Sequence, residues 1–268
     1  MNEKTTPLLV VLLIVAAFAI GSMWTKIQLL QSGSGSLTAP VAVQQPSAAQ
    51  PSQPTQPTAP AVSLDKIKPL FADGYMHFGD ASKKVLFVEI SDPSCPFCHY
   101  AGGKNPELAQ SSTRFLPVSA GGTYNPPVEE IRKLVTSGKA SYAWIYSNGH
   151  GNGELGSQAL YCAFEKGKFW EAHDLLMSNS GYELMNNTVR NDKTQSGTVA
   201  QFLSTAVDSS FMKTCLESGK YADKLTRDQQ VSQTLGFQGT PHFFVNATGF
   251  NGAVDYKTAM EPLVKTLL

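Results

Sequence analysis

The longest apolar stretch of the chain lies near its N-terminus. Residues 8–24 contain no charged side chain and only one polar residue, Ser22. About 20 helical residues span the core of a bilayer, and Lys26 can extend its stem along the apolar region while its ammonium group stays in water. We therefore expect residues 1–30 to form an uncleaved signal anchor with one transmembrane helix. A cleaved signal peptide, with Ala17-Phe18-Ala19 before the cut, is the alternative.

A second pattern follows the apolar stretch. Residues 31–63 are rich in Pro, Gln, Ser and Ala, and they contain no charged side chain. Such a segment cannot bury enough apolar surface to offset the entropy of ordering. It is expected to be a disordered linker with polyproline-II stretches, which act as a semi-extended spacer. The folded body is then predicted to occupy residues 64–268.

The body alternates between strand and helix patterns. Residues 85–90 form a short, almost wholly apolar run of β-formers, which is typical of a strand covered on both faces. Further strands are predicted at 141–146, 242–246 and 249–254, and helices at 156–177, 198–216, 220–235 and 256–268. This order predicts an α/β architecture with an inserted helical domain at about 151–235.

Composition and charge exclude some classes of function. The whole chain has 21 basic and 21 acidic residues, and before Asp65 only Glu3, Lys4 and Lys26 are charged. The body is therefore almost neutral, which excludes a chain-wide basic surface for nucleic acid. With 42% apolar and 10% aromatic residues, the chain has enough apolar side chains for a packed core.

The chemistry is expected at Cys95-Pro96-Phe97-Cys98, directly after the first predicted strand. Pro96 suits the first position of a helix, so Cys95 caps that helix and Cys98 lies inside it. Unpaired N–H groups and the helix dipole stabilise a thiolate at Cys95 and lower its pKa. A stabilised thiolate makes the reduced form favourable, and the disulfide therefore oxidising. The dipeptide Pro96-Phe97 lies against the sulfurs and is expected to tune that balance.

Three other interpretations of the motif remain. Cys95, Cys98 and His99 match the C-x-x-C-H pattern of covalent haem attachment, although the buried strand before them argues against it. Half of a zinc site is the second, but the chain has no other C-x-x-C pair. An inert structural disulfide is the third, and it explains poorly why the pair begins a helix.

The motif and three further segments together resemble DsbA-like thiol–disulfide oxidoreductases. The segments are residues 79–98, 159–176, 211–221 and 239–246, in the same order as in that family. The resemblance covers most of residues 75–268 and is more specific than C-x-x-C alone. It implies a thioredoxin fold that carries an inserted helical domain.

The resemblance assigns roles to four positions. Cys95 would be the nucleophile that forms mixed disulfides with client proteins, and Cys98 would be the buried resolving thiol. Pro241 would be a cis-proline that faces the redox pair, and Thr240 would offer backbone groups to an extended client peptide. Local sequence alone leaves a trans turn proline equally open at Pro241.

Glu89 matches a buried acid of the family, six residues before the first cysteine of the pair. Alone in an apolar strand, its carboxyl group should have a raised pKa and could relay a proton for Cys98. The alternative is a carboxylate that points to solvent at the end of the strand.

The remaining cysteines and two histidines have less specific expectations. Cys162 and Cys215 resemble the second, structural disulfide of part of the family, which would close a long loop and stabilise by about 4 kcal/mol. Two buried free thiols are the alternative. His99 and His242 lie near the proposed site and could tune the Cys95 thiolate, or they could simply occupy a surface helix position and a strand start.

One region departs from the family. Glycines and prolines interrupt the chain between residues 102 and 127, where typical members continue more directly to the next strand. An insertion of roughly 25 residues is inferred from this comparison. It is expected to form a lid or client-binding rim beside Cys95, or else a passive surface loop.

Together these features predict a membrane protein with a single span and an extracytoplasmic catalytic domain. We expect a protein-disulfide oxidoreductase of the oxidase type that acts on reduced or unfolded client proteins, with no organic cofactor and no metal. A quinone-linked membrane reoxidase is implied by the resemblance only. An isomerase or reductase of the same fold is one alternative, and a non-catalytic peptide-binding module is another.

Overall fold

The structure is a computed structural model, and it describes residues 62–268. The predicted anchor at 1–30 and nearly all of the predicted linker at 31–63 lie outside the described residues. Between residues 62 and 268, no helix has the length and apolar character needed to cross a membrane.

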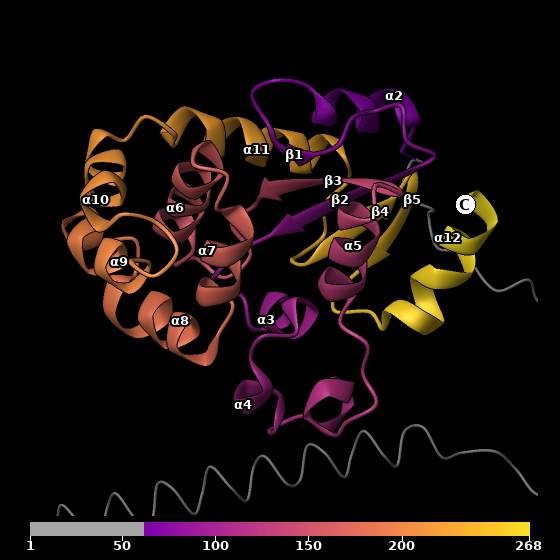
Figure 1. Cartoon of the computed structure of the whole chain (residues 1–268), viewed down its shortest axis with the longest axis horizontal. Helices are drawn as coiled ribbons and strands as arrows, with labels where there is room; N and C mark the ends of the chain where they lie inside the picture. The colour runs from indigo at the N-terminus through magenta and orange to yellow at the C-terminus, as the bar shows by residue number, and fades with distance from the viewer. Residues whose placement is uncertain (1–61) are drawn as a thin grey trace, which may run out of the picture. The chain divides into compact units, whose positions relative to one another are not determined.

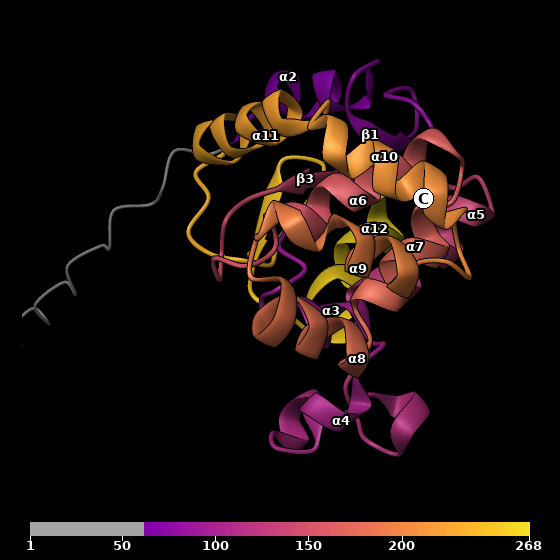
Figure 2. The same cartoon turned by 90° about the vertical axis from the view of Figure 1, so that its left-hand side faces the viewer.

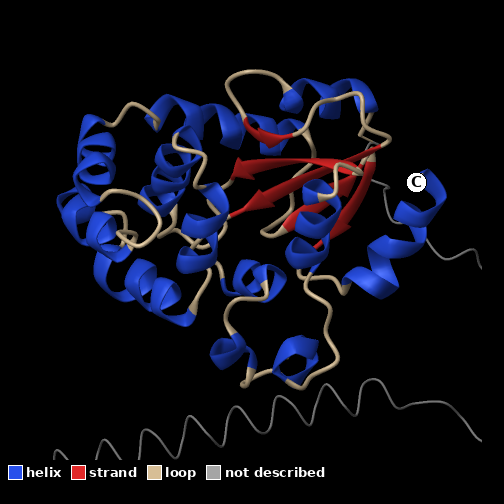
Figure 3. Cartoon of the chain, in the orientation of Figure 1, coloured by secondary structure: helices blue, strands red, loops and turns tan. Residues whose placement is uncertain are grey.

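The centre of the body is a mixed β-sheet (Figures 1 and 3). In chain order its strands are β1 (Met76–Phe78), β2 (Val85–Ser91), β3 (Ala140–Tyr146), β4 (His242–Val245) and β5 (Thr248–Asn251). In space the order is β1-β3-β2-β4-β5. β2 and β3 are parallel, whereas the other three pairs are antiparallel. β2, which leads into the cysteine motif, is therefore the central strand.

Helices surround the sheet and form a separate block beside it. Before and between the first strands lie α2 (Leu64–Ile67), α3 (Pro96–Gly102), α4 (Pro106–Ala109) and α5 (Pro127–Thr136). After β3 come α6 (Glu154–Glu165), α7 (Phe169–Leu176), α8 (Asn179–Glu183), α9 (Ser196–Phe202), α10 (Ser209–Ser218) and α11 (Ala222–Thr234), and the chain ends with α12 (Glu261–Leu267). Short 3₁₀ turns lie at Lys68–Phe71, Thr113–Phe115, Val118–Ala120 and Lys193–Gln195, and π-helical turns at Leu184–Val189 and Tyr256–Met260.

The unbroken apolar run of β2 is explained by burial on both faces of the sheet. Successive side chains of a strand point to opposite faces. Val85 and Phe87 join a large core with side chains of α3, α5, α12 and the helical block. Leu86, Val88 and Ile90 pack instead against α2 and α11, which lie on the other side of the sheet (top of Figure 1). By the same alternation, Glu89 and Ser91 belong to the face that α3 covers.

The segment at 102–127 is the connection between α3 and α5. α3 ends at Gly102 and is followed by Gly103, whose φ of 70° is the left-handed conformation that glycine adopts without strain. The chain then forms α4 and two 3₁₀ turns before Pro127 begins α5. Figure 2 shows this segment as a projection that extends from the rest of the body below α3 and α8.

Several predicted elements differ in detail from the structure. The helical pattern at 156–177 is divided into α6 and α7 at Gly167, whose φ is 67°. The pattern at 198–216 is divided into α9 and α10, and the final helix begins with a π-helical turn. β1, α2 and α5 were not predicted. β1 and α2 are too short to show a period, and the sequence analysis assigned no element to the residues of α5.

Candidate active site

The two cysteines of the motif lie at the start of α3. Cys95 is the residue that precedes the helix, and its carbonyl accepts hydrogen bonds from the N–H groups of Cys98 (3.0 Å) and His99 (3.2 Å). This closed turn places both sulfurs on one side of the helix. Cys95 is 4% exposed, Cys98 is fully buried, and neither takes part in a disulfide.

The two thiols differ strongly in acidity. A hydrogen bond with Cys98 lowers the pKa of Cys95 from 9.0 to about 6, and the backbone N–H groups of Cys98 and Phe97 act in the same direction. Burial raises the pKa of Cys98 well above its ordinary value, and the charge of Cys95 raises it further. At neutral pH the site therefore holds a Cys95 thiolate beside a Cys98 thiol.

The loop before β4 completes the wall beside Cys95. The Thr240–Pro241 peptide bond is cis. Cys95 Sγ lies 3.4 Å from the carbonyl oxygen of Thr240, to which it donates a hydrogen bond when it is protonated. On its other side Thr240 touches Gly149, where an added Cβ would collide with the Thr240 hydroxyl. Backbone groups of this loop therefore lie directly beside the sulfur that would meet a client.

Asp92 is a buried residue of the site that sequence reasoning missed. Its carboxylate accepts hydrogen bonds from the backbone N–H and hydroxyl of Ser94 (2.8 and 2.7 Å) and from the N–H groups of Gly149 and His150 (both 2.9 Å). It thereby ties the turn before α3 to the loop after β3. The available signal was the Asp-Pro-Ser sequence after a strand, which is typical of an Asx turn.

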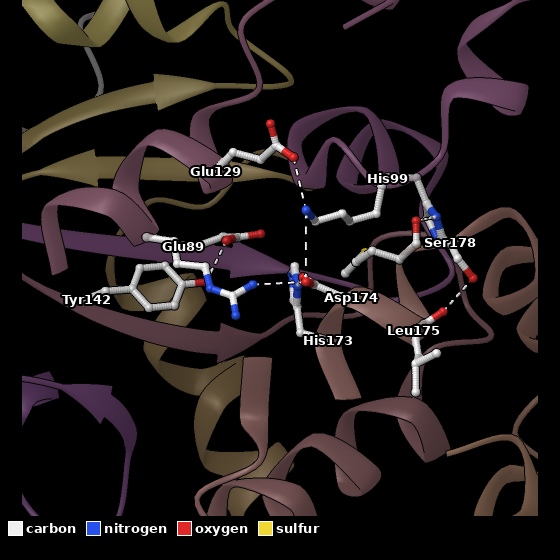
Figure 4. A network of polar contacts seen from close by, with 11 residues as sticks. Glu89, His99, Glu129, Tyr142, His173, Asp174, Leu175 and Ser178 are labelled. Atoms are coloured by element: carbon white, nitrogen blue, oxygen red, sulfur yellow. Dashed lines mark hydrogen bonds and ion pairs between the residues drawn. The ribbon is translucent and has the colours of Figure 1, made fainter. Parts of the chain in front are cut away.

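Glu89 is fully buried and faces α3, so the solvent-facing alternative is wrong. Tyr142, on the neighbouring strand β3, donates a hydrogen bond of 2.6 Å to Glu89 Oε2 (Figure 4). Burial raises the pKa of the Glu89 carboxyl group above 4.5. Ser91 lies two residues along the same face, and its hydroxyl offsets a small part of the rise in pKa at Glu89 and at Cys98. That hydroxyl has no hydrogen-bond partner among residues 62–268.

The two histidines are both buried, so the surface interpretation of His99 is wrong. His99 Nδ1 lies 2.9 Å from the carbonyl of Met177, and Nε2 lies 2.8 Å from that of Pro93. Burial nevertheless lowers the pKa of His99 to about 4. Burial also lowers the pKa of His242, which stacks on Phe244 at the start of β4. At neutral pH neither ring carries the positive charge that tuning of the thiolate would need.

The segment at 102–127 returns to the cysteine motif. Phe97, which lies between the two cysteines, is 47% exposed. Its ring makes edge-to-face contacts with Phe115 of the inserted segment (5.8 Å between centroids) and with Tyr100 (5.7 Å). Phe115 in turn stacks on Tyr100 at 4.6 Å. The position of Phe97 is therefore set by a residue of the insertion, which sequence reasoning did not identify.

The other two cysteines lie away from this site. Cys162 of α6 and Cys215 of α10 form a disulfide that joins two helices of the inserted block. Both residues lie within the apolar core of the domain.

The fold and the site define a class. A C-x-x-C pair at a helix start, a cis-proline loop beside it and a helical block inserted after β3 are the features that the resemblance predicts for a DsbA-like thioredoxin fold. The sequence model of the thioredoxin family matches residues 125–265, more than half of the chain. The protein therefore belongs to the thioredoxin family. The matched range includes Pro241 but begins beyond Cys98.

Solved structures confirm the predicted fold. BdbD from Bacillus subtilis, in its oxidised form, is 17% identical with a TM-score of 0.52, and the match covers 77% of this chain and 96% of BdbD. The alpha-DsbA1 protein of Wolbachia pipientis is 18% identical with a TM-score of 0.54, covering 76% and 95%. Reduced DsbG from Mycobacterium tuberculosis, described as a disulfide bond oxidoreductase, is 16% identical with a TM-score of 0.51, covering 76% and 92%.

Two curated relatives match a similar part of the chain. The Na(+)/H(+) antiporter NhaA 3 of Salinispora tropica is 24% identical over 192 residues, which are 70% of this chain and 24% of that protein. NhaA 1 of Salinispora arenicola is 23% identical over 197 residues, which are 71% of this chain and 24% of that protein. The chain thus spans about a quarter of the length of the curated relatives it matches.

Proposed function

We propose that this protein is a thiol–disulfide oxidoreductase that introduces disulfides into reduced client proteins through Cys95 and Cys98. The observation that carries the proposal is the asymmetry of the two thiols. Cys95 has a pKa of about 6 at a helix start, whereas Cys98 is fully buried with a raised pKa. A purely structural disulfide does not require that one thiol has a lowered pKa and the other a raised pKa.

The exchange would begin with the Cys95–Cys98 disulfide. A client thiolate attacks Cys95 Sγ, a client–Cys95 disulfide forms, and the bond to Cys98 breaks. Cys98 leaves as a thiolate and takes up a proton. A second client thiolate then attacks the client sulfur of the mixed disulfide, and Cys95 leaves as a thiolate. The client has lost two electrons to the pair, and the enzyme is reduced.

The low pKa of Cys95 favours this direction. A thiol of low pKa is a good leaving group, and its stable thiolate favours the reduced form of the enzyme. The carbonyl oxygen of Thr240 lies 3.4 Å from Cys95 Sγ, so the loop at Thr240 and Pro241 lies where an extended client peptide would pair its backbone. Glu89 would supply and receive the proton of Cys98.

We further propose that residues 1–30 anchor the domain on the extracytoplasmic side of the cell membrane. The apolar stretch at 8–24 supports the anchor. The disulfide between Cys162 and Cys215 supports the compartment, because such bonds persist where the environment is oxidising. A quinone-linked membrane reoxidase would then restore the Cys95–Cys98 disulfide, with no organic cofactor or metal in this chain.

A redox titration of the full-length chain in glutathione buffers tests the proposal. A potential of the Cys95–Cys98 pair near about −120 mV is expected for an oxidase. A value near about −270 mV would make the protein a reductase instead. Activity in isomerising a scrambled substrate identifies an isomerase. A wild type that binds clients without any exchange, and binds them equally well as Cys95→Ser, would leave only the peptide-binding module.

A further inference from the structure

Glu89 needs a route by which its proton reaches water. The proposed exchange moves one proton to or from Cys98 in each half-cycle, and Glu89 is the acid on the same face of β2. Its side chain is fully buried under α3 and the helical block. A buried acid that exchanges its proton once per cycle must be connected to solvent by groups that themselves take up and release protons.

The groups around Glu89 come from three elements and from the loop before α5. They are Ser91 on β2, Tyr142 on β3, His173 on α7 and, more distantly, Tyr124 before α5. Burial raises the pKa of Tyr142 far above its ordinary value, so the phenol stays protonated and only donates. Glu89 Oε2 is occupied by this phenol, whereas Oε1 has no hydrogen-bond partner among residues 62–268.

His173 is the neighbour of Glu89 that can both accept and donate a proton. Burial raises the pKa of Glu89, and among the groups that oppose this rise the charge of His173 has the largest effect. In Figure 4 the Glu89 carboxylate lies between the Tyr142 hydroxyl and the His173 ring. Phe169 stacks on that ring at 5.7 Å between centroids and fixes its plane. Within the described part of the chain, Nε2 of His173 has no hydrogen-bond partner.

The other nitrogen of His173 contacts a partly exposed side chain. Nδ1 lies 3.3 Å from Oδ1 of Asp174, whose side chain is 33% exposed. Arg132 (2.9 Å) and Lys104 (3.9 Å) pair with Oδ2 of the same carboxylate. Asp174, Lys104 and Arg132 line a cavity of about 570 Å³ together with Trp170 and Glu129. The ring therefore links the buried acid to a carboxylate in an open pocket.

Another buried imidazole near the site offers no such path. His99 of α3 is also fully buried, but both of its ring nitrogens lie against backbone carbonyls, those of Pro93 and Met177. Burial lowers its pKa to about 4. His173 differs because its Nε2 has no hydrogen-bond partner among residues 62–268, whereas its Nδ1 contacts a partly exposed carboxylate.

We propose that His173 and Asp174 form the proton route between Glu89 and the pocket lined by Lys104, Arg132 and Glu129. The inference rests on the proposed function and specifies how the buried thiol of Cys98 gains and loses its proton. When Cys98 leaves as a thiolate, it gains the proton of the Glu89 carboxyl group. Glu89 then regains a proton that Nε2 of His173 passes on through one bridging water, because Oε1 and Nε2 have no direct hydrogen-bond partner among residues 62–268, while Nδ1 takes a proton from water in the pocket at Asp174. When the Cys95–Cys98 disulfide forms again, each of these protons moves in the opposite direction. His173 acts through Glu89 and does not touch the sulfurs.

The test follows reduction of the oxidised full-length chain by dithiothreitol, as a function of pH, in H₂O and D₂O. His173→Phe keeps an aromatic ring against Phe169 but removes both nitrogens. We expect it to slow reduction about 10-fold, a small part of what general acid–base catalysis contributes, and to change the pH profile. Asp174→Asn should slow reduction less, because pocket water still reaches Nδ1. The matched control His77→Gln, on β1, should match the wild type.

The outcomes separate the route from the function. If folded His173→Phe keeps the wild-type rate, pH profile and solvent isotope effect, His173 only packs and the inference is wrong. If that variant does not fold, Asp174→Asn tests the route in its place, since its side chain is partly exposed, and an unchanged profile overturns the route. Alkylation of Cys95 in the reduced protein should be unaffected in every variant. If the wild type itself is not reduced through Cys95, the proposed function fails first.

Discussion

The chain contains two pairs of cysteines that are almost equally buried and chemically unlike. Cys95 and Cys98 are 4% and 0% exposed, and Cys162 and Cys215 are 0% and 5% exposed. The first pair consists of free thiols at the start of a helix, and the second is a disulfide between two helices. Burial therefore does not distinguish a reactive pair from a structural one.

The difference lies in what surrounds each sulfur. Cys95 has helix N–H groups, the Cys98 thiol and the Thr240 carbonyl around it, and Cys98 has Ser91 and Asp92 nearby. The second pair lies among apolar side chains of α6 and α10, inside their helices rather than at a helix start. A thiolate is stabilised by donors and by a helix N-terminus, so only the first pair is prepared for exchange.

The largest expected effect comes from removing the nucleophile. Cys95→Ser should lower thiol–disulfide exchange with a reduced client to the level of the uncatalysed reaction, because no other cysteine is a free thiol with a lowered pKa. Cys98→Ser should instead accumulate mixed disulfides, which gel shifts under non-reducing conditions detect. Exchange that survives in Cys95→Ser would place the reactive sulfur elsewhere.

Removing the structural pair should give the converse result. The double variant Cys162→Ser, Cys215→Ser is expected to lose about 4 kcal/mol of unfolding free energy, since the bond closes a loop with a sequence separation of 53. Urea denaturation followed by tryptophan fluorescence measures the loss. Exchange through Cys95 at a temperature where the variant is folded should be unchanged. A loss of exchange in the folded variant would contradict the division between the two pairs.

The pH dependence of alkylation should separate the pairs further. The iodoacetamide reaction of reduced Cys95 is expected to rise with a midpoint near pH 6, whereas Cys162 and Cys215 should not react at any pH where the protein is folded. Because the folded pKa lies below the unfolded one, the thiolate stabilises the reduced fold fully above about pH 9 and not at all below about pH 6. In Cys98→Ala the midpoint should move up, since the hydrogen bond from the second thiol is gone.

The smallest expected effect concerns the insertion. Phe115→Ala removes the ring against Phe97 and Tyr100, and aromatic pairs contribute about 0.5–1.5 kcal/mol beyond the area they bury. We expect a stability loss of about 3 kcal/mol, as for a large ring partly buried, and a potential change of at most about 30 mV. Val118→Ala, at a 54% exposed position of the same segment, is the matched control. Equal effects from the two variants would make the insertion a passive loop.

The sequence predicted those parts of the molecule that depend on local pattern. The strand at 85–90, the helix that begins at Pro96 and the helical block after β3 were all indicated by periodicity and proline position. The groups that surround the site were not, because they meet only through folding. Tyr142 is separated from Glu89 by 53 residues, and Gly149 from Asp92 by 57.

By itself, the sequence determined that a cysteine pair stands at the junction of a buried strand and a helix. That arrangement follows from short-range sterics and from the unpaired N–H groups of any helix start. Only the tertiary structure decided that Glu89 loses all contact with water, that His173 lies beside it and that Phe115 rests on Phe97. Desolvation and long-range contacts set those properties, and they depend on which distant segments cover the strand.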